Sequence, residues 1–412
     1  MPRAAVSEPP TPNGPDEGDD RTAAPGADLS DAVVAIGRDA GLHSVGVTTA
    51  DAFEETRRHL FERRRQGLHG DMQFTYRNPD RSTDPTRILP GARALVVGAW
   101  SYRQSKPRPS TGTDVDSEPR RGSSRPQGRV ARYARSDHYA ALRQALAPVA
   151  AHLRTEGWRA TVVCDDNALV DRAAAHRAGL GWFGKNSLLL LPDAGSWFVL
   201  GSVVTDAPLR PTPPRADAPA AHAEGCGSCS RCLTACPTGA LVAPGVVDAR
   251  RCLAWLVQAP GSFPDEFRVA LGDRIYGCDE CQQVCPINKV ADRRDPPPSA
   301  PLPPLPPPRG PARSGSSGTR SADGPFVDLL ELLGATDEEL LAAHGRWYIA
   351  ERDPRYLRRN ALVALGNVGD GGHPGTERAL RRWLGTDDPM VAEHARWAAR
   401  RLGRADLVAP GR

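Results

Sequence analysis

Eight of the nine cysteines in this 412-residue chain lie within one segment of about sixty residues. They follow the pattern Cys226-x-x-Cys229-x-x-Cys232-x-x-x-Cys236-Pro237, then Cys252, then Cys278-x-x-Cys281-x-x-x-Cys285-Pro286. A Cys-x-x-Cys-x-x-Cys turn places three thiolates around one cubic iron–sulfur cluster, and in two-cluster ferredoxins the fourth cysteine of the run binds the other cluster. The spacing therefore predicts two 4Fe–4S clusters and a protein that transfers electrons.

Eight thiolates divide evenly into two sets of four ligands. The predicted ligands of the first cluster are Cys226, Cys229, Cys232 and Cys285. The predicted ligands of the second cluster are Cys236, Cys252, Cys278 and Cys281. Zinc and disulfide bonds are the alternative uses of these cysteines. Zinc sites also contain Cys-x-x-Cys pairs, but they do not require the three-cysteine turn or the repeated Cys-Pro ending, and disulfides need an oxidising compartment.

The chain lacks the usual signs of export. Its first 31 residues are mostly Pro, Ala, Gly, Asp and Arg, with no apolar segment of a signal peptide. No apolar run approaches the length of a membrane span. We therefore expect a cytoplasmic protein with reduced thiols and no membrane association. Nothing in the sequence indicates an obligate partner chain, so we expect a monomer. The net charge of +4 is too small to argue nucleic-acid binding by itself.

The segment before the cysteines has the pattern of a mixed domain. Residues 1–28 are rich in Pro, Gly and Asp and predict a disordered tail. Apolar periodicity predicts helices at 30–40 and 138–154, and strands at 43–49, 93–102, 159–166 and 197–205. Together they predict an α/β or α+β domain over residues 29–210. A patternless Ser/Pro/Arg/Gly segment at 104–128 predicts a disordered insertion.

The cysteines and the remainder predict two further domains, at 223–292 for the clusters and 325–404 for an all-helical end, joined by a Pro/Ser/Gly linker at 293–324. Asp353-Pro354 and Asp388-Pro389 are helix-start signals. A similar pattern recurs 34 positions apart, at 360–364 and 394–398, as in helical-repeat proteins. We expect HEAT-like repeats that dock on the rest of the chain. Their many arginines, including Arg355, Arg358 and Arg359, are either a solvated face or an RNA-binding surface.

A candidate site lies between the predicted strands. The chain has no P-loop and no Gly-x-Gly-x-x-Gly motif. Asp165 and Asp166 end a predicted strand, just after Cys164, which we expect to be a core thiol. The segment AGLGWFGKN at 178–186 is a glycine-dense turn that would let the backbone approach a large flat cofactor, with Lys185 beside it. An ordinary tight turn with a solvated Lys185, and an aspartate that caps the strand, are the alternatives.

Taken together, these elements resemble the epoxyqueuosine reductases. The motifs that carry the resemblance are Leu68-His69-Gly70-Asp71-Met72, Ala131-Arg132-Tyr133-Ala134, Asp165 with Asp171-Arg172, AGLGWFGKN, both cysteine runs, Arg251-Cys252-Leu253, Tyr276-Gly277-Cys278-Asp279 and LRRNALVALGN at 357–367. The resemblance covers about 30–404 without the two low-complexity segments. It implies an oxidoreductase that reduces epoxyqueuosine in the anticodon loop of tRNA to queuosine, the last step of queuosine biosynthesis.

The resemblance also implies the cofactors and their contacts. In this family, two 4Fe–4S clusters pass electrons singly to base-off cobalamin, and an external low-potential donor reloads the clusters. The residue at Asp165 is implied to be the proton donor and to contact the cobalamin. The resemblance implies further cobalamin contacts at Leu189, Leu200, Arg251, Asp279 and Glu280, and a tRNA contact at Gln258. A carboxyl group in a closed, partly apolar pocket has a raised pKa, as a proton donor needs.

The sequence differs from the family pattern at two places, and two other classes of protein are alternatives to this interpretation. The family commonly has Asp-Tyr-His where this chain has Asp137-His138-Tyr139. Asp166 is a second carboxylate beside Asp165, although the spacing to Arg172 favours Asp165. Reductive dehalogenases also combine two clusters with cobalamin, but they typically carry a twin-arginine export signal. A bare ferredoxin-type electron carrier is the other alternative, and it needs no proton donor.

Overall fold

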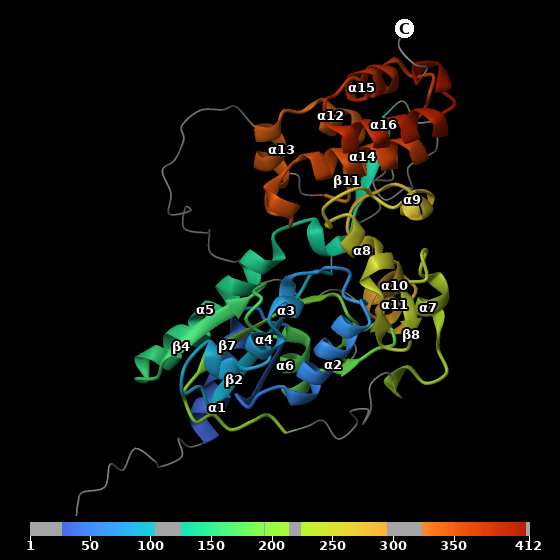
Figure 1. The fold of residues 1–412 in the computed structure, drawn as a ribbon. Helices are drawn as coiled ribbons and strands as arrows, with labels where there is room; N and C mark the ends of the chain where they lie inside the picture. Colours follow the sequence, from blue (N-terminus) through green and yellow to red (C-terminus); the bar gives the residue numbers. More distant parts are fainter. Residues whose placement is uncertain (1–26, 104–124, 193, 214–223, 295–323, 409–412) are drawn as a thin grey trace, which may run out of the picture.

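The computed structural model describes residues 27–103, 125–192, 194–213, 224–294 and 324–408. An N-terminal part, a cysteine-bearing part and a helical C-terminal part pack against one another (Figure 1). The predicted tail at 1–28 and linker at 293–324 lie almost entirely outside the described residues, as does most of the predicted insertion at 104–128. Within the described ranges, no helix has the length and apolar character needed to cross a membrane.

The N-terminal part is built on a four-stranded sheet with the strand order β1-β2-β7-β4. These strands are β1 (Ser44–Thr49), β2 (Ala94–Ser101), β7 (Phe198–Thr205) and β4 (Ala160–Cys164), as the apolar runs predicted. Every neighbouring pair is antiparallel, so the domain is of the α+β kind rather than the α/β kind. The rule that ligands bind at the carboxyl edge of a parallel sheet therefore does not apply here.

Helices cover both faces of this sheet, which explains why its central strands are apolar throughout. Helices α1 (Ala27–Asp39) and α5 (His138–Thr155) pack on one face. Helices α2 (Glu54–Arg65) and α6 (Asp171–Arg177) pack on the other. The short helices α3 (Phe74–Arg77) and α4 (Pro79–Ser82) follow α2, and a hairpin of β5 (Trp182–Phe183) and β6 (Leu189–Leu190) precedes β7.

The cysteine-bearing part consists of short elements. In chain order they are α7 (Arg231–Ala235), the hairpin β8 (Leu241–Ala243) and β9 (Val246–Val247), α8 (Leu253–Leu256), α9 (Asp265–Leu271), β10 (Arg274–Tyr276), α10 (Glu280–Gln283) and α11 (Pro286–Arg293). Its small apolar core includes Val363 from the C-terminal part. The part thus does not enclose a core of its own.

The C-terminal part is almost wholly helical. Its elements are β11 (Phe326–Asp328), α12 (Leu329–Gly334), α13 (Asp337–His344), α14 (Arg355–Val368), α15 (Pro374–Leu384) and α16 (Pro389–Arg401). The predicted start of α16 is confirmed, because the Asp388 side chain accepts the Met390 and Val391 N–H groups. Helices α14 and α16 cross at Gly366, where a Cβ atom would lie 2.6 Å from the Trp397 ring.

A three-stranded sheet joins the three parts. Strand β3 (Gln127–Val130), from the N-terminal part, pairs in parallel with β10 and antiparallel with β11. The predicted insertion at 104–128 therefore extends too far, because Gln127 and Gly128 belong to this strand. Four residues of mixed polarity carry no periodic signal. The pairing partners of β3 lie far away in the sequence, so only tertiary contacts stabilise it as a strand.

Two of the predicted RNA-binding arginines of α14, Arg358 and Arg359, are buried, contrary to their expected role at an RNA surface. Arg359 is fully buried, and its guanidinium donates to the carbonyl oxygens of Ala259 and Leu256 at 2.7 and 2.9 Å. Burial lowers its pKa to about 10. Arg358 is 7% exposed and pairs with Asp337 at 2.5 Å. Both residues hold the C-terminal helices in place.

We expect Arg359→Ala to lower the free energy of unfolding by about 3 kcal/mol or more, because it leaves several buried carbonyl groups without donors. The control is Arg378→Ala, an exposed arginine on α15, for which the change should stay within about 0.5 kcal/mol. Urea unfolding followed by circular dichroism measures both. Equal, small losses for the two variants would contradict the structural role of Arg359.

Candidate functional site

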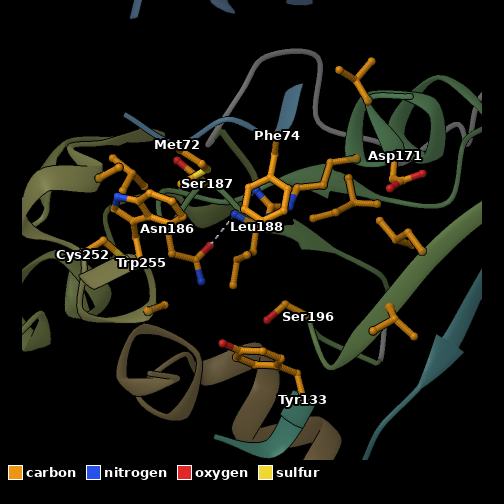
Figure 2. A pocket seen from close by; sticks show the side chains of 18 of the residues that line it. Met72, Phe74, Tyr133, Asp171, Asn186, Ser187, Leu188, Ser196, Cys252 and Trp255 are labelled. Carbon is orange, nitrogen blue, oxygen red and sulfur yellow. Dashed lines mark hydrogen bonds between the residues drawn. The ribbon is translucent and has the colours of Figure 1, made fainter. Parts of the chain in front are cut away.

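A cavity of about 1540 Å³ lies where the three parts meet. Its wall comes from α2, α6 and the β5–β6 hairpin, from the segments around the cysteines, and from residues 346–348 of the C-terminal part. Figure 2 shows side chains of α6, of the β5–β6 hairpin and of the cysteine-bearing part, among them Asp171, Leu188 and Trp255, around one space. Small-molecule pockets usually have volumes of roughly 300–1,000 Å³. This cavity therefore has room for a larger ligand.

The glycine-dense turn forms the β5–β6 hairpin on the cavity wall. A Cβ atom on Gly181 would lie 2.1 Å from the carbonyl oxygen of Leu190, so this glycine lets the two strands approach each other. Asn186 accepts the Leu188 N–H at 3.2 Å (Figure 2). The Lys185 ammonium group does not line the cavity but donates to the carbonyl oxygen of Gly227 at 2.6 Å. The turn thus brings Asn186, Leu188 and their neighbours to the wall, and Lys185 contacts the cysteine-bearing part.

The two predicted cysteine sets differ in position. Every member of the second set, Cys236, Cys252, Cys278 and Cys281, lines the cavity. No member of the first set, Cys226, Cys229, Cys232 and Cys285, does so. In the described part of the chain, no three His, Cys, Asp or Glu side chains are grouped so that they could hold a single metal ion.

The thiols influence one another mainly within these sets. Burial raises the pKa of Cys281, and Cys278, Cys252, Cys232 and Cys236 raise it further. Burial likewise raises the pKa of Cys232, with a smaller contribution from Cys226 and Cys285. The thiol of Cys281 is thus near all other members of the second set, and Cys232 is near two members of the first. Cys232 and Cys281 also interact, so the two sets are neighbours.

The segment before Cys278 packs on the Ala-Arg-Tyr-Ala element. Gly277 has a φ of +76°, and a Cβ atom there would lie 2.6 Å from both the Ala131 Cβ and the Tyr133 hydroxyl group. The Ala131 N–H donates to the carbonyl oxygen of Tyr276 at 3.0 Å. Only glycine fits this position, both for its backbone angle and for the close approach. Two motifs nearly 150 residues apart therefore form one packed unit.

A buried polar network attaches the following helices to the N-terminal part. Gln282 donates to the hydroxyl group of Tyr102 at 3.1 Å and to the carbonyl oxygen of Ser196 at 3.0 Å. Asn288 donates to the Ser196 hydroxyl group at 2.9 Å and accepts the Ser196 N–H at 2.7 Å. The network holds α10 and α11, which flank Cys285, against the loop that contains Ser196.

Asp165 lies at the cavity, directly after β4, with a φ of +53°. Its side chain is accessible from the cavity, yet the surrounding protein raises its pKa by burial. Arg143 opposes this shift, while Asp137 and Asp166 add to it. Asp166 also lines the cavity, and its carboxylate accepts the Ala168 N–H at 2.9 Å. Cys164 is buried in the core, as expected.

Asp171 was not singled out as a site residue by the sequence, although it stands in a recognised motif. It lines the cavity (Figure 2), and burial raises its pKa well above the ordinary value, with Asp165 adding to the shift. Its Oδ1 atom is buried and has no hydrogen-bond partner among the described residues. The neighbouring Arg172 side chain lines the cavity too. The Asp-Arg pair at the start of a helix was the available signal.

The other predicted ligand contacts divide into two groups. Leu189, Leu200, Glu280 and Gln258 line the cavity. Arg251 and Asp279 do not. Arg251 donates to the carbonyl oxygen of Thr238 at 3.0 Å, and the buried Asp279 accepts the Arg132 N–H at 3.1 Å. Arg355 is half-buried and pairs with Asp353 at 2.8 Å, at the start of α14.

Aromatic side chains that the sequence analysis missed stand at the rim. Tyr348 lines the cavity and remains 42% exposed. Its ring centroid lies 5.0 Å from that of Phe74, which comes from α3. Trp347 stacks on Tyr276 at 4.6 Å. The available signal was the Arg346-Trp347-Tyr348 run in a short connection between helices, since binding residues often lie on loops.

Comparison with known proteins gives concordant results. Residues 225–288 match the family described as the 4Fe-4S double cluster binding domain. The epoxyqueuosine reductase of Xanthomonas campestris is 33% identical over 89% of this chain and 94% of its own length. The epoxyqueuosine reductase of Pseudomonas aeruginosa is 32% identical over 92% of this chain and 95% of its own length.

Solved structures agree with these relatives. A crystal structure of epoxyqueuosine reductase with an epoxyqueuosine-modified tRNA-Tyr stem loop matches with a TM-score of 0.74 and 28% identity, over 91% of this chain and 90% of that chain. The Bacillus subtilis enzyme matches with a TM-score of 0.70 and 28% identity, over 92% of both chains. On the identity and coverage of its relatives, the chain belongs to the epoxyqueuosine reductase family.

Proposed function

We propose that this protein reduces epoxyqueuosine in tRNA to queuosine, with electrons from two 4Fe–4S clusters and a bound cobalamin. The overall change removes the epoxide oxygen as water, breaks its two C–O bonds and forms one C=C bond, which takes two electrons and two protons. One observation carries the proposal. The second cysteine set lines the same cavity as the carboxyl group of Asp165, whose pKa is raised by the surrounding protein.

The cluster ligands follow from the cysteine positions. We assign Cys226, Cys229, Cys232 and Cys285 to the first cluster, and Cys236, Cys252, Cys278 and Cys281 to the second, within a cluster domain at 223–292. The cavity supports this partition, because all four members of the second set line it and no member of the first set does. The clusters would supply electrons one at a time. The part of the second set that faces the cavity is where those electrons would leave the cluster domain.

The cavity suits a corrinoid in size and lining. Its volume of about 1540 Å³ exceeds that of ordinary small-molecule pockets. Leu189 and Leu200 give it an apolar wall, and the unpartnered Oδ1 atom of Asp171 offers a polar contact to a ligand. When bound, cobalamin would supply a cobalt centre that takes up single electrons and reduces the substrate. Asp165, Leu189, Leu200 and Glu280 would contact it, with Arg251 and Asp279 supporting the wall from behind.

Asp165 is the proposed proton donor. Its raised pKa enlarges the protonated fraction near neutral pH, and that fraction falls as the pH rises through the raised value. The nearby Asp137 and Asp166 carboxylates act in the same direction, whereas the Arg143 guanidinium opposes them. A positioned acid of this kind accelerates proton transfer by about 10²–10⁴-fold.

The tRNA would approach from the rim formed by the C-terminal part. Gln258, Phe74 and Tyr348 line the cavity on that side, and exposed aromatic rings are the side chains on which proteins stack unpaired RNA bases. We propose that the HEAT-like helices at 325–404 position this rim, and that Arg355 contributes a positive charge next to it. The buried Arg358 and Arg359 serve packing instead.

A deletion strain tests the proposed function directly. Nucleosides from its tRNA should contain epoxyqueuosine in place of queuosine, and the wild-type gene should restore queuosine. Liquid chromatography with mass spectrometry distinguishes the two nucleosides by one oxygen. Normal queuosine in the deletion strain would refute the assignment.

Asp165→Asn should lower kcat by about 10²–10⁴-fold while the iron content and corrinoid affinity stay unchanged. Asparagine tolerates the positive φ of this position, so the backbone should be preserved. Single-turnover assays on epoxyqueuosine-containing stem loops measure the rate.

Asp166→Asn is the matched control, since its amide oxygen can still accept the Ala168 N–H. It should retain turnover. If only the Asp166 variant lost turnover, Asp166 and not Asp165 would be the proton donor.

Tyr348→Ala should raise KM for the tRNA stem loop about tenfold with little change in kcat, because stacking on an aromatic ring contributes about 1–3 kcal/mol per base. The control is Phe61→Ala, an exposed aromatic residue of α2 that does not line the cavity. An unchanged KM for the Tyr348 variant would show that this ring makes no contact with RNA.

A further inference from the structure

A second, smaller groove lies on the surface of the cluster domain. It has a volume of about 520 Å³ and shares no lining residue with the large cavity. Its lining residues are Ser230, Arg231, Thr234, Ala235, Val284 and Lys289. They come from α7, from the residue before it, from Val284 just before α11, and from α11 itself. The groove is therefore a feature of the two cysteine runs themselves.

The groove adjoins two members of the first cysteine set. Cys232 is the second residue of α7, directly after the lining residue Arg231. Cys285 is the N-cap of α11, directly after the lining residue Val284. Electron transfer between proteins weakens steeply with distance, so a carrier must dock close to the cluster that it reduces. A protein seated in this groove would lie within one or two residues of both thiols.

The groove is also basic. Arg231 and Lys289 are exposed, and neither has a carboxylate partner among the residues that the structure describes. Arg293, at the end of α11, is exposed as well. The adjacent Asp292 does not offset these charges, because it is paired with Arg132 at 3.0 Å. Between the charges, Val290 is 46% exposed.

The positions of the two cysteine sets define a path for electrons through the cluster domain. The second set lines the cavity, whereas Cys232 and Cys285 of the first set directly follow residues that line the basic groove. Helix α7, which contains Cys232, packs against α10, which contains Cys281, so the two sets are neighbours. A carrier that docked on the cavity side would occupy the space needed by the substrate. The groove is the surface from which the first set is approached without blocking the cavity.

We propose that this basic groove is the docking site of an acidic one-electron carrier protein that reduces the first cluster. The inference rests on the proposed function, because it requires the first set to hold a cluster. Each encounter moves one electron, so the carrier is oxidised by one electron and the cluster is reduced by one. Two encounters supply the two electrons of one turnover.

The chemistry of the groove matches a transient electron-transfer contact. Such interfaces are small, under about 1,200 Å². Opposite charges on the two partners raise the association rate about 10–10³-fold at low ionic strength, and salt removes this gain.

The test uses the full-length protein with its clusters, and an acidic flavodoxin as the probe. Binding of oxidised flavodoxin is measured by surface plasmon resonance, and cluster reduction by flavodoxin hydroquinone is followed by stopped-flow absorbance, both without tRNA. We expect Arg231→Glu/Lys289→Glu to weaken binding and slow reduction at least about tenfold at low salt. In the wild type, both quantities should fall steeply as the salt concentration rises.

The matched control is Arg38→Glu/Arg378→Glu, which changes the net charge equally through two exposed arginines outside the groove. It should behave like the wild type. Reduced methyl viologen, a small donor that needs no docking surface, should reduce all three proteins at comparable rates. Salt-independent binding of flavodoxin to the wild type would overturn the proposal, whatever the variants show.

Two other outcomes would also overturn it. If the groove variant and the control lost flavodoxin affinity and reduction rate equally, net charge alone, and not the groove, would attract the carrier. Displacement of flavodoxin by unmodified tRNA, together with weaker tRNA binding by the groove variant, would make the groove an RNA site. A preparation without iron–sulfur absorbance would instead contradict the cluster assignment under the proposed function, which keeps the two failures distinct.

Discussion

Two buried amide side chains, Gln282 and Asn288, hold the cysteine-bearing helices against the loop at Ser196. Helices α10 and α11 have four and eight residues, too few for a stable isolated helix. Their positions, and those of Cys281 and Cys285, therefore depend on contacts with the N-terminal part. An unsatisfied buried amide costs about 1–3 kcal/mol, so the fully bonded arrangement is strongly preferred over any shifted one. The cavity exists because this arrangement leaves the second cysteine set facing the N-terminal sheet.

The cluster domain also depends on contacts with the C-terminal part, and these contacts join the three parts into one packed unit. The small core of the cluster domain is completed by Val363 of α14, and Arg359 satisfies carbonyl groups next to that core. Strand β3 then joins β10 and β11 in one sheet. A domain of about 70 residues buries too little apolar surface to be robust without metals or neighbours. Packing on both neighbours compensates for this, and it places the aromatic rim at Tyr348 beside a cavity that belongs mainly to the other two parts.

Much of the architecture was predictable from local pattern. The four strands of the main sheet, α5 and the capped start of α16 were expected at nearly their observed positions, because apolar periodicity and caps act over a few residues. Position in three dimensions was not predictable in this way. Arg359 has the sequence context of a surface arginine but binds buried carbonyl groups, and Lys185 reaches Gly227 instead of the cavity. The first half of β3 was taken for the end of an insertion. Each of these depends on a partner far away in the chain.

The sequence by itself determined the chemistry that this protein can perform. Cysteine spacing is a local property that follows from ligand geometry around a cluster, and the motifs around Asp165 and the glycine turn identified the family. Only the tertiary structure decided how these groups are connected. It placed one cysteine set at the cavity and two cysteines of the other set next to a basic surface groove, because burial and charge are properties of the folded chain. It also brought Asp171 and Tyr348 to the same cavity from segments with no shared sequence signal.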